Sequence, residues 1–281
     1  MEHDGGGLEF LVLTEDSSKT AEQVQQKIVR LLLRSLDSRA NTARVSFAAL
    51  PAGPARDVLR GNRWREQPLR SPLDEGLRLL VLRIASHLAS SQRFCSFHYD
   101  GDTPWSERER SIADGKFDEV IVRSLRRLLT ERHAPKRRAN TIGLPNAAEN
   151  ELTDEQRTQR VEAALARLLP VVPYYSIEAW LFQNTDELRV ACGERSAEAN
   201  VVEQCRARCD EWAADRALLD EIEQVKESVC VKDTANDRLA ESLSNAVFDA
   251  LLAAGKSLAA TRDRWSRCGS LVANLEAIRP R

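Results

Sequence analysis

The residues of this chain that could do chemistry are acids, and they stand where predicted strands end. A first hydrophobic run, residues 8–14, is followed by Glu15, and a second, residues 93–99, is followed by Asp100 and Asp102. Side chains at positions i and i+2 of an extended segment point the same way, so the two aspartates can face one ion together. Ligands of open α/β sheets gather outside the carboxyl ends of the strands, where these acids fall. Such oxygen donors suit Mg²⁺ or Mn²⁺, so the pattern predicts a metal site for phosphodiester chemistry.

A fourth acid, Glu178, is the one charge in the apolar run 177–182. Burying a lone carboxylate is costly, so we expect Glu178 to point into the same cleft from the start of a helix and to take part in catalysis. The alternative is a partly exposed first helical turn, where glutamate complements the helix dipole. His98 precedes Asp100 by two positions and is turned to its side. It could assist a leaving group, or it could be a packed strand histidine.

The elements that must position these acids follow from hydrophobic periodicity. Strands are predicted at residues 8–14, 43–50, 93–99 and 170–175. Helices are predicted at about residues 19–36, 73–90, 117–132 and 154–168. Residues 51–72 hold four prolines and two glycines, so we expect a long loop there. From residue 176 onward the periodicity predicts only helices.

This order of elements specifies an α/β fold, a layered sheet with helices on its faces. We expect it to occupy residues 1–190, and residues 191–281 to form a helical cap packed on the sheet. The prolines near residues 170–173 restrict the last strand to a sheet edge or to strand ends.

The bulk composition is that of an ordinary globular protein. With 41 basic and 43 acidic residues the formal net charge is −2. This argues against a strongly basic protein that coats nucleic acid without sequence preference. Charges interrupt every apolar stretch before the roughly 18 residues that a membrane span needs. The amino terminus is acidic and glycine-rich, without the apolar core of a signal peptide, so we expect no membrane association and a cytoplasmic address.

The six cysteines show no C-x-x-C pair and no spacing typical of a disulfide framework, which agrees with that address. Cys205 and Cys209 lie one helical turn apart and could form half of a zinc site. No second pair completes it, and buried cysteine is common.

A dense basic segment follows the acids in the sequence. We expect it to border the acidic cleft and to contact phosphates of a nucleic acid. The alternative is a solvated helix face running into a loop. Its residues are Arg123, Arg126, Arg127, Lys136, Arg137 and Arg138.

Glu15 after a first strand, with an Asp-x-Asp after a later one, resembles the Toprim domain of type II and IA topoisomerases, bacterial primases and overcoming-lysogenization-defect nucleases. Residues 174–182, Y-Y-S-I-E-A-W-L-F, resemble the "-x-E-x-W-L-" segment of small Toprim-like proteins of the RloB type and of uncharacterised families. Those proteins are often associated with defence. The resemblance covers about residues 8–190.

The resemblance implies a metal-dependent phosphoryl-transfer site. Glu15 would be the motif glutamate, Asp100 and Asp102 the motif aspartates, and Glu178 the late glutamate. Many relatives have glycine directly after the first glutamate, where this chain has Asp16.

The expected function is therefore that of a Mg²⁺-dependent endonuclease acting on DNA or RNA, in prokaryotic antiphage defence. The alternative is a non-catalytic binding or regulatory subunit that docks a partner, such as the separately encoded ATPase that often accompanies relatives. The chain has no G-x-x-x-x-G-K-[ST] loop of its own. Topoisomerases with a Toprim domain use a tyrosine nucleophile in another domain. The three tyrosines of this chain fall on predicted β-strands, which disfavours topoisomerase activity. The choice of nucleic acid and the formation of a homo-oligomer are left open.

Overall fold

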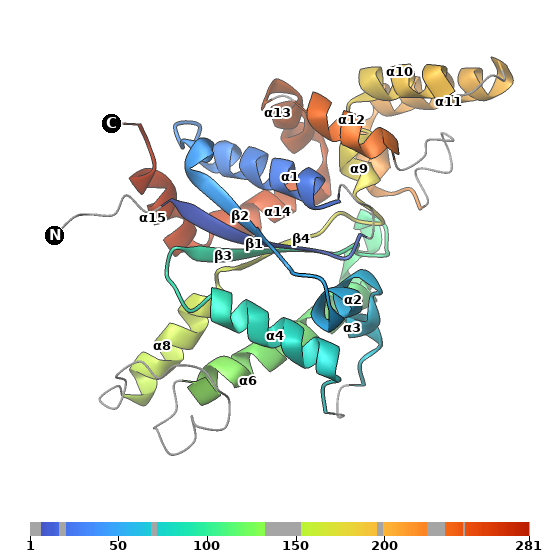
Figure 1. Cartoon of the computed structure of the whole chain (residues 1–281). Helices are drawn as coiled ribbons and strands as arrows, with labels where there is room; N and C mark the ends of the chain where they lie inside the picture. The colour runs from blue at the N-terminus through green and yellow to red at the C-terminus, as the bar shows by residue number, and fades with distance from the viewer. Residues whose placement is uncertain are drawn as a thin grey trace.

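A parallel β-sheet lies at the centre of the protein (Figure 1). The computed structural model describes residues 7–16, 21–68, 72–132, 153–195, 199–223, 234–243 and 245–280. The strand order is β2-β1-β3-β4, with β1 at Leu8–Thr14, β2 at Val45–Ala49, β3 at Arg93–His98 and β4 at Leu168–Val171. Every neighbouring pair is parallel, so all four strands end at one side of the sheet, which we call the carboxyl edge. The predicted α/β class is confirmed.

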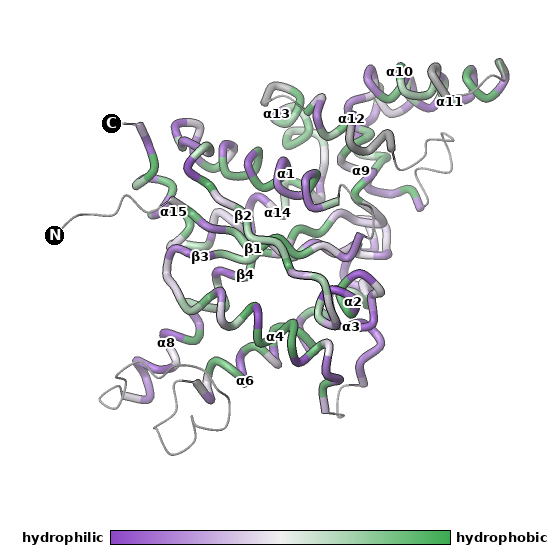
Figure 2. The backbone as a smooth tube through the Cα atoms, viewed as in Figure 1, coloured by the Kyte–Doolittle hydropathy of each residue, from purple (hydrophilic) through white to green (hydrophobic). Residues whose placement is uncertain are grey.

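The central strand β1 is covered on both faces. Six of its seven residues are buried, which is the near-continuous hydrophobic pattern of a parallel strand between two helical layers. Leu8 and Phe10 belong to the core on one face, whereas Leu11 and Leu13 belong to the core on the other. Figure 2 shows hydrophobic residues concentrated along the central strands.

The first face of the sheet is covered by α1 and by the helices after β4 (Figure 1). Trp265 connects this helical layer to the sheet, because its Nε1 donates a 2.9 Å hydrogen bond to the carbonyl of Pro170 in β4 and its ring stacks on Phe10. The helices are α1 Ala21–Leu36, α9 Glu178–Leu181, α10 Thr185–Arg195, α11 Ala199–Ala214, α12 Thr234–Ser242, α13 Asn245–Ala254, α14 Lys256–Ser266 and α15 Gly269–Ala277, with a short 3₁₀ helix η4 at Arg216–Asp220.

The predicted helical C-terminal region is therefore present and packs on the sheet. The boundary expected at residue 190 falls inside α10, and one hydrophobic core contains residues from both sides of it.

The second face is covered by the helices between β2 and β4. Trp64, Phe97, Tyr99 and Phe117 form its aromatic centre, with ring centroids 5.0 to 6.1 Å apart. The helices are α2 Pro54–Arg60, α3 Arg63–Glu66, α4 Glu75–His87, α5 Ile112–Lys116, a π-helical turn η3 Phe117–Val122, α6 Arg123–Arg132 and α8 Asp154–Leu165. Two short 3₁₀ helices are η1 Thr42–Arg44 and η2 Trp105–Arg110.

Two sequence expectations are wrong. The expected loop at residues 51–72 contains α2 and α3, because Pro54 occupies the first turn of a helix, where its missing N–H is tolerated, and Gly61 follows that helix as its C-cap. The last strand begins two residues earlier than expected and ends at Val171, so the tyrosines of the 170–175 segment lie beyond it. As expected for a strand that contains proline, β4 is an edge strand.

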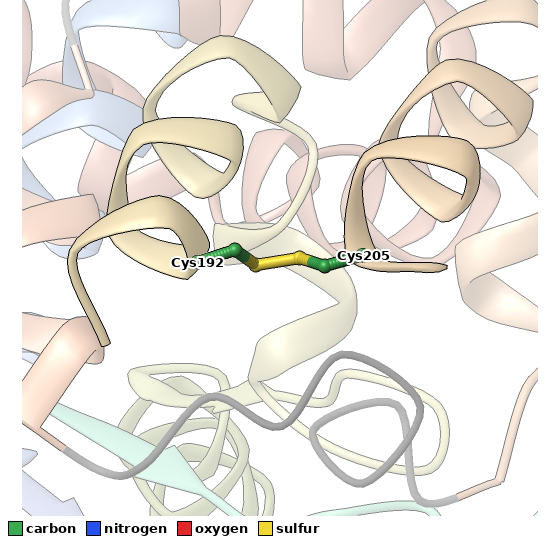
Figure 3. Close-up of a disulfide and its surroundings, with 2 residues drawn as sticks. All are labelled: Cys192 and Cys205. Atoms are coloured by element: carbon green, nitrogen blue, oxygen red, sulfur yellow. A yellow bond between two sulfur atoms is a disulfide. The ribbon is translucent and has the colours of Figure 1, made fainter. Parts of the chain in front are cut away.

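A disulfide joins α10 to α11 through Cys192 and Cys205 (Figure 3). The sequence spacing did not indicate this bond, because the pairing depends on two helices folding back on each other. Since the Cys205 sulfur is bonded to Cys192, it does not form a thiolate pair with Cys209. Disulfides are typical of oxidising compartments, so the cytoplasmic address stays a prediction without support from the cysteines. Among the helices that the structure describes, none is long and apolar enough to cross a bilayer.

Candidate functional site

Glu15 and Asp100 meet at the carboxyl edge. They follow the adjacent strands β1 and β3, whose register pairs Thr14 with His98. The backbone N–H of Asp100 donates a 2.6 Å hydrogen bond to Oε1 of Glu15, which is only 6% exposed. The parallel pairing of the two strands therefore brings together two acids that are 85 positions apart in the sequence.

Gly101, between the two aspartates, is closely packed and precedes a residue with left-handed backbone. Gly101 lies against the ring of Tyr174, where an added Cβ would come within 3.1 Å of a ring carbon. Its N–H donates a 3.0 Å hydrogen bond to the carbonyl of Pro173, and its carbonyl accepts one of 2.8 Å from the hydroxyl of Ser111. Asp102 follows with a φ of 55°, in the left-handed region that aspartate tolerates better than most residues.

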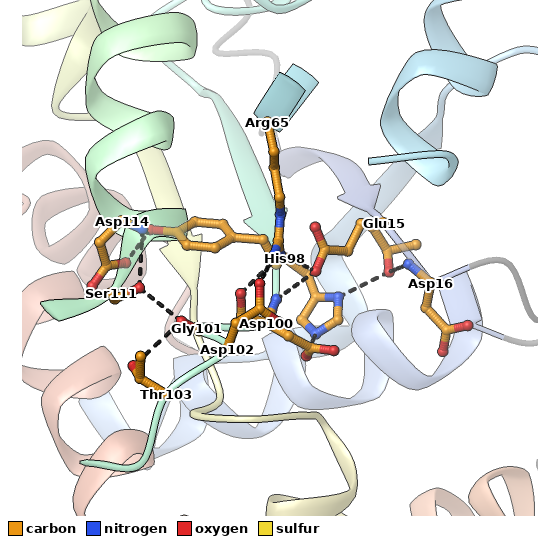
Figure 4. Close-up of polar contacts among 12 residues, drawn as sticks. Glu15, Asp16, Arg65, His98, Asp100, Gly101, Asp102, Thr103, Ser111 and Asp114 are labelled. Atoms are coloured by element: carbon orange, nitrogen blue, oxygen red, sulfur yellow. Dashed lines mark hydrogen bonds and ion pairs between the residues drawn. The ribbon is translucent and has the colours of Figure 1, made fainter. Parts of the chain in front are cut away.

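Arg65 connects the three predicted acids (Figure 4). Its guanidinium donates 2.5 Å and 2.8 Å hydrogen bonds to Oε1 of Glu15 and to the carbonyl of Asp100, and it forms an ion pair with Oδ2 of Asp102. Sequence reasoning missed Arg65 because it lies in the segment expected to be a loop. The available signal was its neighbour Trp64, a large apolar residue in a polar stretch, which is fully buried and fixes α3 against the sheet.

His98 lies on the same side of β3 as Asp100. Its Nδ1 is 3.0 Å from the hydroxyl of Thr14, and its Nε2 is 3.5 Å from Oδ1 of Asp100. Burial alone would lower the pKa of His98, but the contact with Asp100 and the charges of Asp100 and Glu15 raise it above the ordinary value. The histidine is thus buried and packed, and it also faces the acids.

Glu178 is the first residue of α9 and is 2% exposed. The structure therefore removes the alternative of a partly exposed first turn. Burial is the largest cause that raises the pKa of Asp100. The negative charge of Glu178 raises this pKa further, whereas His98 lowers it. That the side chain of Glu178 points into the same cleft stays a prediction.

The acids outnumber the cationic groups that face them. Burial raises the pKa of Glu15 to about 7, with Asp100 acting in the same direction and Arg65 opposing it. An ionised Glu15 is therefore incompletely compensated by Arg65 and His98. An added cation would stabilise its charged form.

Several polar atoms of this site are buried without a hydrogen-bond partner. They are four of the twelve such side-chain atoms among the described residues: Glu15 Oε2, Arg65 Nε, His98 Nε2 and Asp100 Oδ1, of which the last two face each other 3.5 Å apart. Unsatisfied buried groups are rare in native proteins and commonly indicate a water, an ion or a ligand. Oε2 of Glu15 and Nε of Arg65 are thus the two groups of this site that a further polar partner would satisfy.

The fit to a metal ion is partial in this arrangement. Within the ranges given above, no group of three or more histidine, cysteine, aspartate or glutamate side chains is arranged to hold one. Arg65 gives a physical reason, since its guanidinium takes Oε1 of Glu15 and Oδ2 of Asp102. Mg²⁺ is usually bound by one or two carboxylates, with waters and substrate phosphates completing its shell. Glu15 and Asp100 supply that number of carboxylates, with Oδ1 of Asp100 also facing His98.

Arg126, in the described part of the basic segment, lies away from these acids. Arg126 pairs with Glu162 of α8, six residues before β4 begins, and so lies toward the amino ends of the strands (Figure 1). Arg127 pairs with Glu131 on its own helix, and Arg123 begins that helix. The expectation that Arg126 borders the acidic cleft is corrected, because α6 runs along the sheet away from the carboxyl edge. Contact of this segment with phosphates stays a prediction. Lys136, Arg137 and Arg138 lie outside the described residues.

Comparison of the chain with protein-family models, with curated proteins and with solved structures finds no match. By its fold and site, the chain is an α/β protein with an acidic site at the carboxyl edge of a parallel sheet.

Proposed function

We propose that this protein is a Toprim-like, metal-dependent endonuclease that hydrolyses phosphodiester bonds of DNA or RNA. The observation that carries the proposal is that one guanidinium contacts the carboxylates of Glu15 and Asp102 and the carbonyl of Asp100, while Oε2 of Glu15 has no hydrogen-bond partner. Three acids collected from two strands destabilise a fold unless a cation compensates them. A substrate that arrives with its own cations suits such a site.

The described side chains suit distinct roles in phosphodiester hydrolysis. Oε2 of Glu15 and Oδ1 of Asp100 are the oxygens that would hold Mg²⁺ or Mn²⁺. When bound, the ion would activate a water and neutralise charge that develops on the scissile phosphate. The guanidinium of Arg65 has the planar donor geometry that recognises phosphate oxygens. Glu178 adds negative charge that favours a cation near Asp100.

His98 suits proton transfer to the leaving oxygen. Its raised pKa favours the protonated form, its Nδ1 is held by Thr14, and its Nε2 faces Oδ1 of Asp100 at 3.5 Å. A positioned imidazole of this kind can act as a general acid.

A role in prokaryotic antiphage defence, in the cytoplasm, is part of the proposal and rests on the resemblance of residues 174–182. The same resemblance supports a separately encoded ATPase as partner. The nucleic acid, DNA or RNA, is the substrate class that the resemblance implies.

A second candidate function is a non-catalytic binding or regulatory subunit. It is favoured by the ion pairs that Arg65 makes with Glu15 and Asp102, because a structural salt-bridge network would need no metal. In that case the sheet is a scaffold, and the helical layer after β4 is the surface that docks a partner.

The experiment that separates these candidates is incubation of the full chain with plasmid, single-stranded DNA and transfer RNA. Each substrate is tested with Mg²⁺, with Mn²⁺ and with a chelator. The nuclease proposal expects cleavage of at least one substrate that depends on the metal. Failure to cleave any of the three, with metal binding also absent, would favour the scaffold.

A further inference from the structure

Arg65 contacts the acids in the way that a bound metal ion would. Its guanidinium contacts one oxygen from each of the three motif positions: a carboxylate oxygen of Glu15, the carbonyl of Asp100 and a carboxylate oxygen of Asp102. We propose that Arg65 is an internal counter-cation that competes with a divalent metal ion for these acids, so that metal binding displaces its guanidinium. The inference rests on the proposed function, because it presupposes that the acids bind metal.

Burial makes each charge of the Arg65–Glu15 pair depend on an opposite charge close by. The side chain of Arg65 is 16% exposed and that of Glu15 is 5% exposed, so each charge needs an opposite one close by. In the described part of the chain, every side-chain hydrogen bond of Arg65 goes to this site. Without metal, Arg65 therefore prevents mutual repulsion among the acids.

The guanidinium is held by these oxygens and not by a second set of partners. Its Nε has no hydrogen-bond partner, and the remaining contact is with the ring of Trp64, 5.3 Å from its centroid. Trp64 is fully buried and anchors the backbone of α3. The side chain of Arg65 can therefore leave the acids while the helix that carries it stays in place.

Simultaneous occupation is unfavourable. An ion on Oε2 of Glu15 would lie on the same carboxylate whose Oε1 already accepts the guanidinium. Two positive charges at such a separation repel each other strongly in a partly buried site. Oδ2 of Asp102 likewise accepts the guanidinium, so an ion on that oxygen would meet the same repulsion.

The test measures Mn²⁺ binding to the full chain without nucleic acid, by isothermal titration calorimetry, in wild type, Arg65→Gln and Arg65→Lys. Arg63→Gln is the matched control, since Arg63 is exposed on the same short helix and the change removes the same charge. Competition predicts that Arg65→Gln binds Mn²⁺ about tenfold or more tightly than wild type. Arg65→Lys, which keeps a charge but cannot bridge the acids, should bind a few-fold more tightly. Arg63→Gln should match wild type.

The outcomes separate this inference from the proposed function. Equal Mn²⁺ affinity in wild type, Arg65→Gln and Arg65→Lys would overturn the competition while leaving the metal site intact. Weaker binding in both Arg65 variants would show that Arg65 supports the ion, which also overturns the competition. Absence of Mn²⁺ binding in every variant would overturn both. If circular dichroism shows that Arg65→Gln does not fold, the comparison of Arg65→Lys with wild type decides.

Discussion

The backbone N–H of Asp100 donates a 2.6 Å hydrogen bond to Oε1 of Glu15 and so joins the ends of β1 and β3. This bond fixes the distance between two acids contributed by segments far apart in the sequence. It also occupies one oxygen of Glu15 and leaves the other, Oε2, without a partner. The hydrogen bond therefore positions the two acids and leaves one carboxylate oxygen of Glu15 without a hydrogen-bond partner.

The stability of the metal-free protein should fall as the pH rises through the titration of Glu15. Burial raises the folded-state pKa of Glu15 to about 7 from an ordinary 4.5, so between these values the folded protein holds a proton that the unfolded chain lacks. The contribution of the neutral carboxyl is fully present below about pH 4.5 and is lost by about pH 7. At 1.36 kcal/mol per pKa unit, the loss is at most about 3 kcal/mol.

Glu15→Gln removes this titration. In the presence of chelator, its free energy of unfolding relative to wild type should therefore improve from pH 5 to pH 8, as measured by urea unfolding. Glu9→Gln is the control, because Glu9 pairs with Arg93 near the amino end of β1. A difference between Glu15→Gln and wild type that stays constant over this range would contradict the incomplete compensation of Glu15.

The basic residues of α6 should affect nucleic-acid binding separately from the chemical step. Replacing Arg123, Arg126 and Arg127 by glutamine should reduce the steepness of log affinity against log salt by up to about 3. The reason is that binding releases fewer counterions from the nucleic acid when phosphate contacts are lost. The cleavage rate at saturating substrate should stay near wild type, since α6 extends away from the acids.

The matched control for this triple variant removes three arginines from elsewhere, Arg206, Arg208 and Arg267. It should leave the salt slope unchanged. Identical slopes for the two triple variants would assign the α6 arginines to a plain solvated surface.

The bond between Cys192 and Cys205 should stabilise the α10–α11 hairpin. Its sequence separation is 13, and a loop of about 15 residues corresponds to about 3 kcal/mol of stabilisation in the chain-entropy account. A Cys192→Ala, Cys205→Ala double variant should therefore melt at a lower temperature than wild type under oxidising conditions. Under reducing conditions the two proteins should converge. A melting temperature of wild type that does not respond to reductant would contradict this role.

The sequence predicts most of the sheet and the acids but not what lies between them. The strand-end positions of Glu15 and Asp100 are visible because a parallel strand covered on both faces has a nearly continuous hydrophobic pattern. Arg65 is not visible in this way, because α3 is too short to show a helical period and it follows proline and glycine residues. Its role arises from the tertiary placement of Trp64 under the sheet.

The basic segment shows the opposite limit. Arg126 follows the acids closely in sequence, yet the helix that carries it runs back along the sheet, and its guanidinium pairs with Glu162. Closeness in sequence to the end of β3 therefore does not imply closeness in space, because the helix after a strand leads the chain toward the start of the next parallel strand.

The most direct measurement of the central claim is nucleic-acid cleavage by Asp100→Asn in the presence of Mg²⁺. The substitution keeps the shape of the side chain and the backbone bond to Glu15 but removes one of the charges that would hold the ion. The nuclease account predicts a cleavage rate lower by about two orders of magnitude or more, with unchanged or slightly higher thermal stability. Arg63→Gln, prepared alongside, should cleave at the wild-type rate. Full cleavage activity in an Asp100→Asn, Asp102→Asn double variant would contradict a metal-dependent role for this site.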